Sequence, residues 1–238
     1  MERFDLRSAS AFRTTAEVPA ERVTAFLQKV YGWMFAGLAI TALVAFVVAG
    51  SPTLLQYIFF NRLLFIGLIV AELGLVFYLS ARVETLAPNV AMLLFIIYAA
   101  LNGVTLSFVL LVYTGESITT TFLVTAGMFG ALALYGSTTT RSLAGVGQFF
   151  FMGLIGLVLA SIVGMFWHND TLQFLIATIG VIVFTGLTAW DAQRLKLMAA
   201  TVPEERSGSY AVVGALALYL NFINLFLMLL RLLGGRRD

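Results

Sequence analysis

The C-terminal segment from Ser209 to Gly235, SYAVVGALALYLNFINLFLMLLRLLGG, constrains the fold more than any other part of the chain. No charged residue occurs between Ser207 and Leu230, and a helix of that length is long enough to cross a hydrocarbon core. Small and polar residues recur along one side of that helix at steps of three, four or seven: Gly214, Ala217, Asn221, Asn224 and Arg231. Amides and a guanidinium are costly against lipid, whereas small residues let helices approach closely. The segment therefore predicts a helix inside a bundle of other spans.

The composition of the 238-residue chain excludes a water-soluble protein. Hydrophobic residues make up 61% and charged residues 11%, against roughly 45–50% and about 25% in soluble domains. Long uninterrupted apolar stretches predict membrane helices, because the strands of a barrel would alternate over about ten residues. The absence of cysteine excludes disulfides and thiolate metal sites. Residues 1–24 mix arginines with acids, so we expect no cleavable signal peptide there.

Charges, turn residues and prolines divide the chain into seven predicted membrane helices, an all-α polytopic fold. The predicted spans are 31–49, 63–80, 88–113, 118–135, 146–167, 172–198 and 209–235. All four prolines, Pro19, Pro52, Pro88 and Pro203, fall in the proposed junctions, and residues 115–117 read as a tight turn. Gly156, Ala160 and Gly164 predict a close-packing face on the fifth helix. We predict a cytoplasmic tail over residues 1–24, a transmembrane domain over 25–235 and a C-terminal tail over 236–238.

The distribution of lysine and arginine predicts the orientation. Ten of the 14 lie in the N-terminal tail and the loops on its side of the membrane, and four lie on the other side. The tail should therefore be cytoplasmic. The last segment either spans fully or dips into the bilayer and returns. The sequence leaves this choice open, and with it the side of the C-terminus.

Glu72 is predicted to lie midway along the second span. A carboxylate at that depth costs about 2.5–3.5 kcal/mol on insertion scales, so it should face the interior and find a partner or be protonated. Arg231 is the predicted counter-ion. Two interpretations stay open: a structural ion pair or helix–helix hydrogen bond, and a direct role in permeation.

Asp191 is predicted to lie near the cytoplasmic end of the sixth span, in the segment WDAQRLK. Its partner is either Arg194, one helical turn later, or Arg82, which is predicted at the same depth. Asn221 should lie about midway along the last helix. Amides in membranes are more often packing groups than ligands, although their carbonyl oxygens can bind a hard cation. Asp191 becomes a candidate calcium ligand only through the family resemblance described below.

Several classes of enzyme are excluded by the residues present. The only histidine, His168, falls in a short loop, so no serine–histidine pair or zinc helix can form within the membrane. The last span contains no lysine for a retinal Schiff base. Asp191 and Glu72 are predicted to lie half a bilayer apart, too far for an aspartyl-protease pair. We expect no enzymatic activity, no cofactor and no nucleic-acid partner.

Three segments carry a resemblance to a known family: ELGLVFYLSARV, FTGLTAWDAQRLK and GALALYLNFINLFLMLLRLLG. They resemble the Bax inhibitor-1 family (transmembrane Bax inhibitor motif proteins), in particular its bacterial branch, and the likeness extends over residues 25–235. The resemblance implies seven helices, six of them around a central C-terminal one, and a pH-sensitive calcium leak. It also implies a bacterial inner-membrane location. Bacterial members include one that modulates a membrane-bound quality-control protease, which makes such a protease a candidate partner.

The resemblance assigns roles to individual residues. Asp191 matches the aspartate at the mouth of the pore, and Arg82 matches the arginine that pairs with it when the pore is shut. Glu72 and Arg231 match a second buried pair. The family pattern LYLDF carries a second aspartate where this chain has Asn221. Two adjacent carboxylates cannot both ionise easily, which makes such a pair a pH sensor. We therefore expect weaker pH dependence here, and weaker calcium binding.

The sequence supports three functions, in this order. The first is a cation leak channel, with calcium as the ion, closed by an Arg82–Asp191 contact. The second is a non-conducting protein that binds other membrane proteins, such as a protease, and uses its buried charges only structurally. The third is a proton-coupled transporter, for which Glu72 is the main support.

Overall fold

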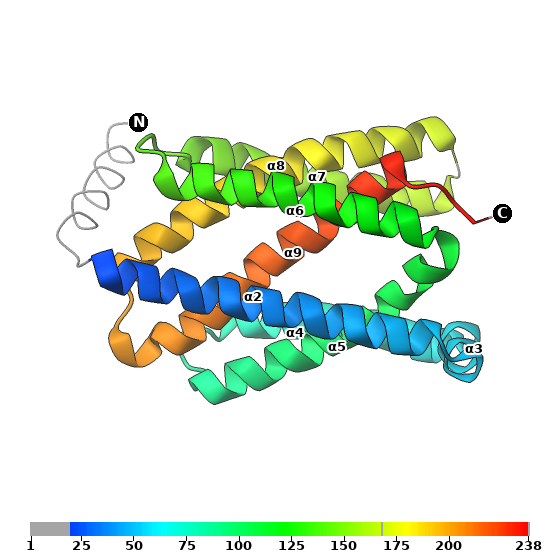
Figure 1. Cartoon of the computed structure of the whole chain (residues 1–238), viewed down its shortest axis with the longest axis horizontal. Coiled ribbons are helices and arrows are strands. Elements are labelled where there is room, and N and C mark those ends of the chain that lie inside the picture. The colour runs from blue at the N-terminus through cyan, green and yellow to red at the C-terminus, as the bar shows by residue number, and fades with distance from the viewer. Residues whose placement is uncertain (1–19, 168, 238) are drawn as a thin grey trace. The chain divides into compact units, whose positions relative to one another are not determined.

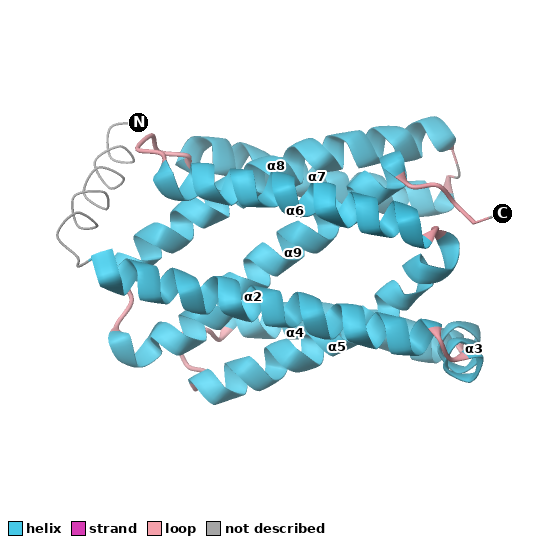
Figure 2. Ribbon diagram, in the orientation of Figure 1, coloured by secondary structure: helices cyan, strands magenta, loops and turns pink. Residues whose placement is uncertain are grey.

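The computed structural model describes residues 20–167 and 169–237, and of Met165 the backbone alone. Figure 2 shows helices joined by short loops throughout this part of the chain. The α-helices are α2 (Ala20–Ala49), α3 (Pro52–Phe60), α4 (Arg62–Ala81), α5 (Pro88–Val112), α6 (Gly115–Thr138), α7 (Ala144–Phe166), α8 (Asp170–Thr201) and α9 (Ser207–Leu233). Within the described residues, seven of them, all except α3, are long and apolar enough to cross a membrane. The prediction of an all-α protein with seven spans is confirmed.

Several helices begin at residues that favour a helix N-terminus. Pro52 and Pro88 are the first residues of α3 and α5, where the missing N–H of proline has no intrahelical partner to lose. The side chains of Ser51 and Asn61 accept hydrogen bonds from Leu54 and Leu64 at the starts of α3 and α4. The proline junctions are thus confirmed at these positions, and Pro203 precedes the short 3-10 helix Glu204–Arg206. Pro19 lies outside the described residues.

Two features predicted between the spans are wrong. The predicted N-terminal tail, residues 1–24, stays a prediction: α2 begins at Ala20, and residues 1–19 lie outside the described part of the chain. With 30 residues, α2 is about 45 Å long, so its charged first turns can project beyond a core of about 30 Å. The turn predicted at 115–117 is the first turn of α6. The junction between the first two spans contains the helix α3, which was not predicted.

The end of the chain is also more ordered than a free tail. The backbone N–H of Arg237 donates to the carbonyl of Val112 at 2.9 Å, and Arg236 forms an isolated bridge with Tyr113. Two residues of the predicted C-terminal tail, 236–238, thus bond to the backbone around the end of α5, and the tail as a separate part stays a prediction. In α9 the helix continues without a break for 27 residues, which is long enough to span the bilayer fully. The side of the C-terminus stays open.

The chain forms two compact units (Figure 1). Unit 1 contains Glu116–Thr201 and Leu220–Gly235, with the start of α2. Unit 2 contains Phe26–Gly115 and Val202–Tyr219, with the last residues of the chain. Helix α9 is thus shared: its residues up to Tyr219 belong to unit 2, and those from Leu220 onward belong to unit 1.

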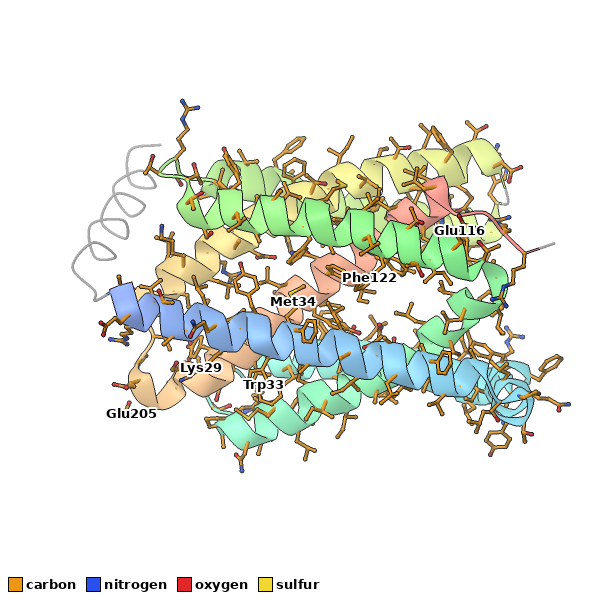
Figure 3. All side chains as sticks on the ribbon, in the orientation of Figure 1. Lys29, Trp33, Met34, Glu116, Phe122 and Glu205 are labelled. Atoms are coloured by element: carbon orange, nitrogen blue, oxygen red, sulfur yellow. The ribbon has the colours of Figure 1, made fainter. Side chains whose placement is uncertain are left out.

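Unit 1 is built on apolar packing among α7, α8 and the second part of α9. Its core contains Leu157 of α7, four residues of α8 and two of α9: Ile176, Val183, Phe184, Leu187, Leu225 and Leu229. Helix α6 adds an aromatic contact, in which the ring of Phe122 lies 5.4 Å from that of Phe222 (Figure 3). Since lipid is as apolar as these side chains, close packing rather than transfer from water holds the helices together.

One glycine permits the closest approach within unit 1. A Cβ atom at Gly136 of α6 would overlap the carbonyl of Ala189 on α8, so no larger residue fits between these two backbones. The predicted small-residue face on α7 is only partly correct. Gly164 does approach Gln173 and Ile176, but a Cβ at Gly156 would meet no atom within 4 Å. Four-residue spacing identified the stripe without showing which of its members face a neighbouring helix.

Unit 2 packs α2, α4 and α5 with the first part of α9. The buried ring of Tyr219 makes edge contacts with Phe95 and Tyr98 of α5, with centroids 5.8 Å apart in both cases. Gly103 of α5 lies against the backbone of Thr41 on α2. Near the start of α9, the hydroxyl of Ser209 donates to the carbonyl of Leu86 at 2.7 Å.

The C-terminal helix is the most buried of the seven spans. In its most apolar stretch 67% of residues are buried, against 6–44% in the others. The first part of α9 packs with the helices of unit 2 and the second part with those of unit 1. The prediction of a central C-terminal helix, made from its uncharged length and its polar side, is confirmed.

Candidate functional site

The predicted pair of Asp191 and Asn221 forms in unit 1. Asn221 Nδ2 donates to Asp191 Oδ2 at 2.7 Å and joins α9 to α8. The Asn221 side chain is buried, with 6% of its surface exposed. An ionised carboxylate can only accept hydrogen bonds, so the amide must present its nitrogen to Asp191. The oxygens of both side chains are of the hard type that calcium prefers.

The end of α8 around Asp191 is fixed by side chains that bind the loop after α6. Gln193 donates to the carbonyl of Arg141 and accepts from the N–H of Leu143, both at 2.8 Å. One turn later, Lys196 Nζ donates to the carbonyl of Ser137 at 2.7 Å. These bonds use backbone groups of the loop and of the last turn of α6, and they hold the helix that carries Asp191.

Arg194 is the charged neighbour of Asp191 along the helix. It lies one turn after the carboxylate and attracts it electrostatically. Its guanidinium lies 5.7 Å from the centre of the Trp190 ring, within the range of a cation–π contact. An ion pair between Arg194 and Asp191 stays a prediction.

Arg82, the alternative partner, ends α4 in unit 2. Its backbone N–H donates to the carbonyl of Tyr78, and its own carbonyl accepts from Thr85 and Leu86, while its side chain is exposed. The predicted contact between Arg82 and Asp191 would join the two units, and it stays a prediction.

Glu72 belongs to a polar network within unit 2. Its carboxylate accepts a hydrogen bond from the hydroxyl of Thr105 at 2.5 Å and a further one from Asn102. Tyr219 donates to Asn102 Oδ1 at 3.0 Å, and its hydroxyl lies 2.7 Å from that of Thr41. Side chains from α2, α4, α5 and α9 thus share one chain of hydrogen bonds, as the helix–helix interpretation of Glu72 predicts.

Arg231 is held at the other end of unit 1 by an amide. Its Nη1 donates to Gln173 Oε1 at 2.9 Å, and Gln173 Nε2 donates to the carbonyl of Gly164 at 3.2 Å. Gln173 therefore connects the last turn of α9 to α7 and α8. Glu72 and Arg231 lie in different units, and their pairing stays a prediction.

Sequence reasoning missed the uncharged members of these clusters. Thr41, Thr105, Gln173, Gln193 and Tyr219 each make a hydrogen bond between elements of one unit. Two glutamines within a membrane helix are the signal that would have found part of this set, because an amide in lipid needs a partner. The hydroxyl groups give no such signal, since threonine and tyrosine are common in apolar helices.

Metal-binding capacity is limited. Among the described residues, no three aspartate, glutamate or histidine side chains converge as a metal site would require. Asp191 and Asn221 could hold a cation weakly, with water completing its coordination.

Comparison with known proteins places the chain in a family. Residues 23–238 match the family profile described as "Inhibitor of apoptosis-promoting Bax1". The inner membrane protein YbhL of Escherichia coli K12 is 49% identical over 222 residues, which cover 92% of this chain and 95% of YbhL. A Borreliella burgdorferi protein is 44% identical over 90% of this chain and 93% of its own. A Deinococcus radiodurans protein is 39% identical over 98% of this chain and its own full length.

Proposed function

The chain belongs to the Bax inhibitor-1 family, and on that premise we propose that it forms a cation leak pathway through the bacterial inner membrane, with calcium as the ion. The observation that carries the proposal is the hydrogen bond between Asn221 and Asp191, made between two membrane-spanning helices. Ionisable residues in spans cost several kcal/mol and commonly mark ion pathways. The oxygens of this pair are of the type that calcium binds.

Asn221 sets the expected character of the leak. Where the family pattern has a second aspartate, this chain has a neutral donor that bonds to Asp191. The pair lacks the like-charge repulsion that makes two carboxylates share a proton. The leak should therefore depend less on pH than the family pattern implies, and should hold calcium less tightly.

The gate in this proposal is an Arg82–Asp191 contact at the cytoplasmic mouth, which rests on the family resemblance. Removal of the guanidinium in Arg82→Ala should raise the calcium flux of the purified protein in liposomes. A flux that falls or stays the same would count against this gate without affecting the conduction proposal.

Asp191→Asn tests conduction itself. It keeps the size of the side chain but removes the charge, so calcium flux into liposomes with an entrapped fluorescent indicator should fall at least tenfold. Asp170→Asn is the matched control, because it makes the same substitution at the first residue of the same helix. Equal flux in the wild type and both variants would exclude Asp191 from the pathway.

A non-conducting membrane interaction protein is the second candidate. It is supported by one observation: among the described residues, every fully buried side-chain nitrogen and oxygen has a hydrogen-bond partner. A buried polar cluster with a purely structural role requires a hydrogen-bond partner for each of its polar atoms. Capture of a membrane protease by the full chain, and loss of capture without residues 1–19, would favour this function if liposomes show no flux.

A further inference from the structure

The connection between α2 and α4 contains an apolar helix that is too short to cross a membrane. Helix α3, PTLLQYIFF, has nine residues and is about 13 Å long. The preceding α2 already exceeds the thickness of a hydrocarbon core. Helix α3 therefore lies where the core gives way to the lipid headgroups.

The exposed side chains of this helix suit that level of the bilayer. Phe60 is 85% exposed and Leu63, at the start of α4, is 83% exposed, while Ile58 is buried. Tyr57 is also largely exposed. Aromatic and aliphatic groups that would be unfavourable in water are stable at the boundary between headgroups and acyl chains.

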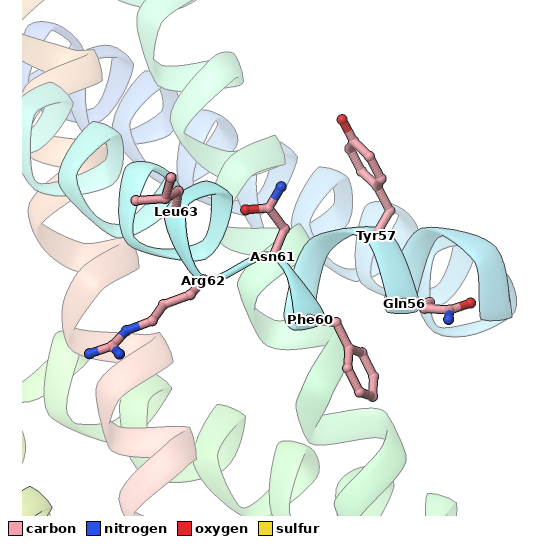
Figure 4. Close-up of a pocket in the computed structure, with 6 residues that line it drawn as sticks. All are labelled: Gln56, Tyr57, Phe60, Asn61, Arg62 and Leu63. Carbon is pink, nitrogen blue, oxygen red and sulfur yellow. The ribbon is translucent and has the colours of Figure 1, made fainter.

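The corner between α3 and α4 also carries an isolated positive charge. Arg62 is the one charged residue between positions 30 and 71. It borders a shallow, open hollow of about 530 Å³, together with Gln56, Tyr57, Phe60, Asn61 and Leu63 (Figure 4). In Figure 4 the side chains of Arg62 and Phe60 project to one side of the corner and that of Asn61 projects to the other. No carboxylate borders the hollow, so its electrostatic preference is for an anion.

The amides beside Arg62 can add hydrogen bonds. Asn61 Oδ1 accepts from the N–H of Leu64 at 3.2 Å, which leaves the amide nitrogen as a donor. Gln56, one turn earlier on α3, offers a second NH₂ group. A guanidinium with adjacent amide donors is suited to a phosphate.

We propose that this corner binds one phospholipid with an anionic headgroup. Arg62 contacts the phosphate, Asn61 and Gln56 donate to the polar headgroup beyond it, and Phe60 and Leu63 lie against the first methylenes of the acyl chains. A soluble phosphate would use the arginine and the amides but would leave Phe60 and Leu63 uncovered. The proposal concerns unit 2 alone and does not depend on cation conduction.

The test is native mass spectrometry of the full chain in detergent, titrated separately with phosphatidylglycerol and phosphatidylcholine. Arg62→Gln should weaken the tightest binding of phosphatidylglycerol about fivefold, the effect expected of one basic residue near a membrane surface. Its effect on phosphatidylcholine should be smaller, because that headgroup carries no net charge. Arg141→Gln is the matched control, since Arg141 is also exposed in a turn between helices. Phe60→Ser should weaken the binding of both lipids.

Three results would overturn the proposal. The first is unchanged phosphatidylglycerol binding by Arg62→Gln. The second is an equal loss in Arg141→Gln, which would show a general effect of charge. The third is displacement of the lipid by glycerol phosphate at similar concentrations, which would identify a site for soluble phosphate.

Discussion

Individual side chains of neighbouring helices provide the hydrogen-bond partners for the polar groups of α9. Asn221 bonds to Asp191 within unit 1, and Tyr219, two positions earlier, bonds to Thr41 and Asn102 within unit 2. Neither residue is charged, yet each joins its helix to another through a group that lipid cannot satisfy. The chemistry of each bond can be changed without altering the size of the side chain much.

Asn221→Asp should make the flux depend more steeply on pH. Two facing carboxylates cannot both ionise easily, so the pair would retain a proton over part of the physiological range, and its charge would then change with pH. Calcium flux measured in liposomes from pH 6 to pH 8 would show this. Asn224→Asp is the control, because the Asn224 side chain bonds to the carbonyl of Leu220 on its own helix. Identical profiles for wild type and Asn221→Asp would contradict the expectation.

Tyr219→Phe should lower the free energy of unfolding by about 1–2 kcal/mol, from two interhelical hydrogen bonds at about 0.6 kcal/mol or somewhat more each. The ring contacts with Phe95 and Tyr98 remain, so the change isolates the hydroxyl. Reversible unfolding in mixed detergent micelles measures the difference. Tyr135→Phe, at an exposed position on α6, should change stability by less than about 0.5 kcal/mol. A loss no larger than in that control would show that the network adds no stability.

At the scale of whole helices, close packing depends on which atoms a glycine faces and less on how many glycines the helix contains. α6 and α8 approach closely because Gly136 leaves room for the carbonyl of Ala189. α7 carries several glycines as well, and they differ in what they face. Gly147 and Gly153 lie against Trp190 and Val183, whereas Gly156 faces open space.

Gly136→Ala should therefore destabilise the protein by about 1–3 kcal/mol, the usual cost of overpacking. Gly156→Ala makes the same change where nothing obstructs it. It should be neutral or stabilising by up to about 1 kcal/mol, because alanine is the better helix former. Unfolding in mixed micelles compares the two directly. If both variants lost the same stability, the loss would have to come from helix propensity or lipid contact, and not from the contact with Ala189.

Sequence reasoning reached the helices and their order because uncharged length, charge and proline are local signals. It found Asp191, Asn221, Glu72 and Arg231 because polar groups in apolar spans are conspicuous. It missed α3, which is as apolar as a span but too short to be one. It also missed the role of Gln173, because which helix a side chain faces depends on packing that one sequence does not encode in a readable form.

For the whole molecule, seven full spans would place Ala20 and Leu233 on opposite sides of the membrane. With the N-terminus in the cytoplasm, as the distribution of lysine and arginine predicts, the connection between α8 and α9 is cytoplasmic and that between α5 and α6 is external. Both carry an exposed glutamate, Glu205 and Glu116, respectively (Figure 3).

The lack of native cysteine makes this orientation directly testable. In intact cells with a permeable outer envelope, an impermeant maleimide should label Glu116→Cys and should leave Glu205→Cys unlabelled until the inner membrane is opened. Each variant serves as the control for the other. The reverse pattern would invert the orientation, and labelling of both residues in intact cells would contradict the number of spans between them.

The sharing of α9 between two units has a consequence for biosynthesis. Helix α9 leaves the ribosome after the other six spans, so a nascent chain holds those six with neither unit complete until α9 has been made. Unit 2 is complete once the residues up to Tyr219 have been made, and unit 1 is complete only after the following residues of α9 have been made. Premature termination before Tyr219 would leave both groups of helices without their partners on α9, whereas termination after Tyr219 would leave only unit 1 incomplete.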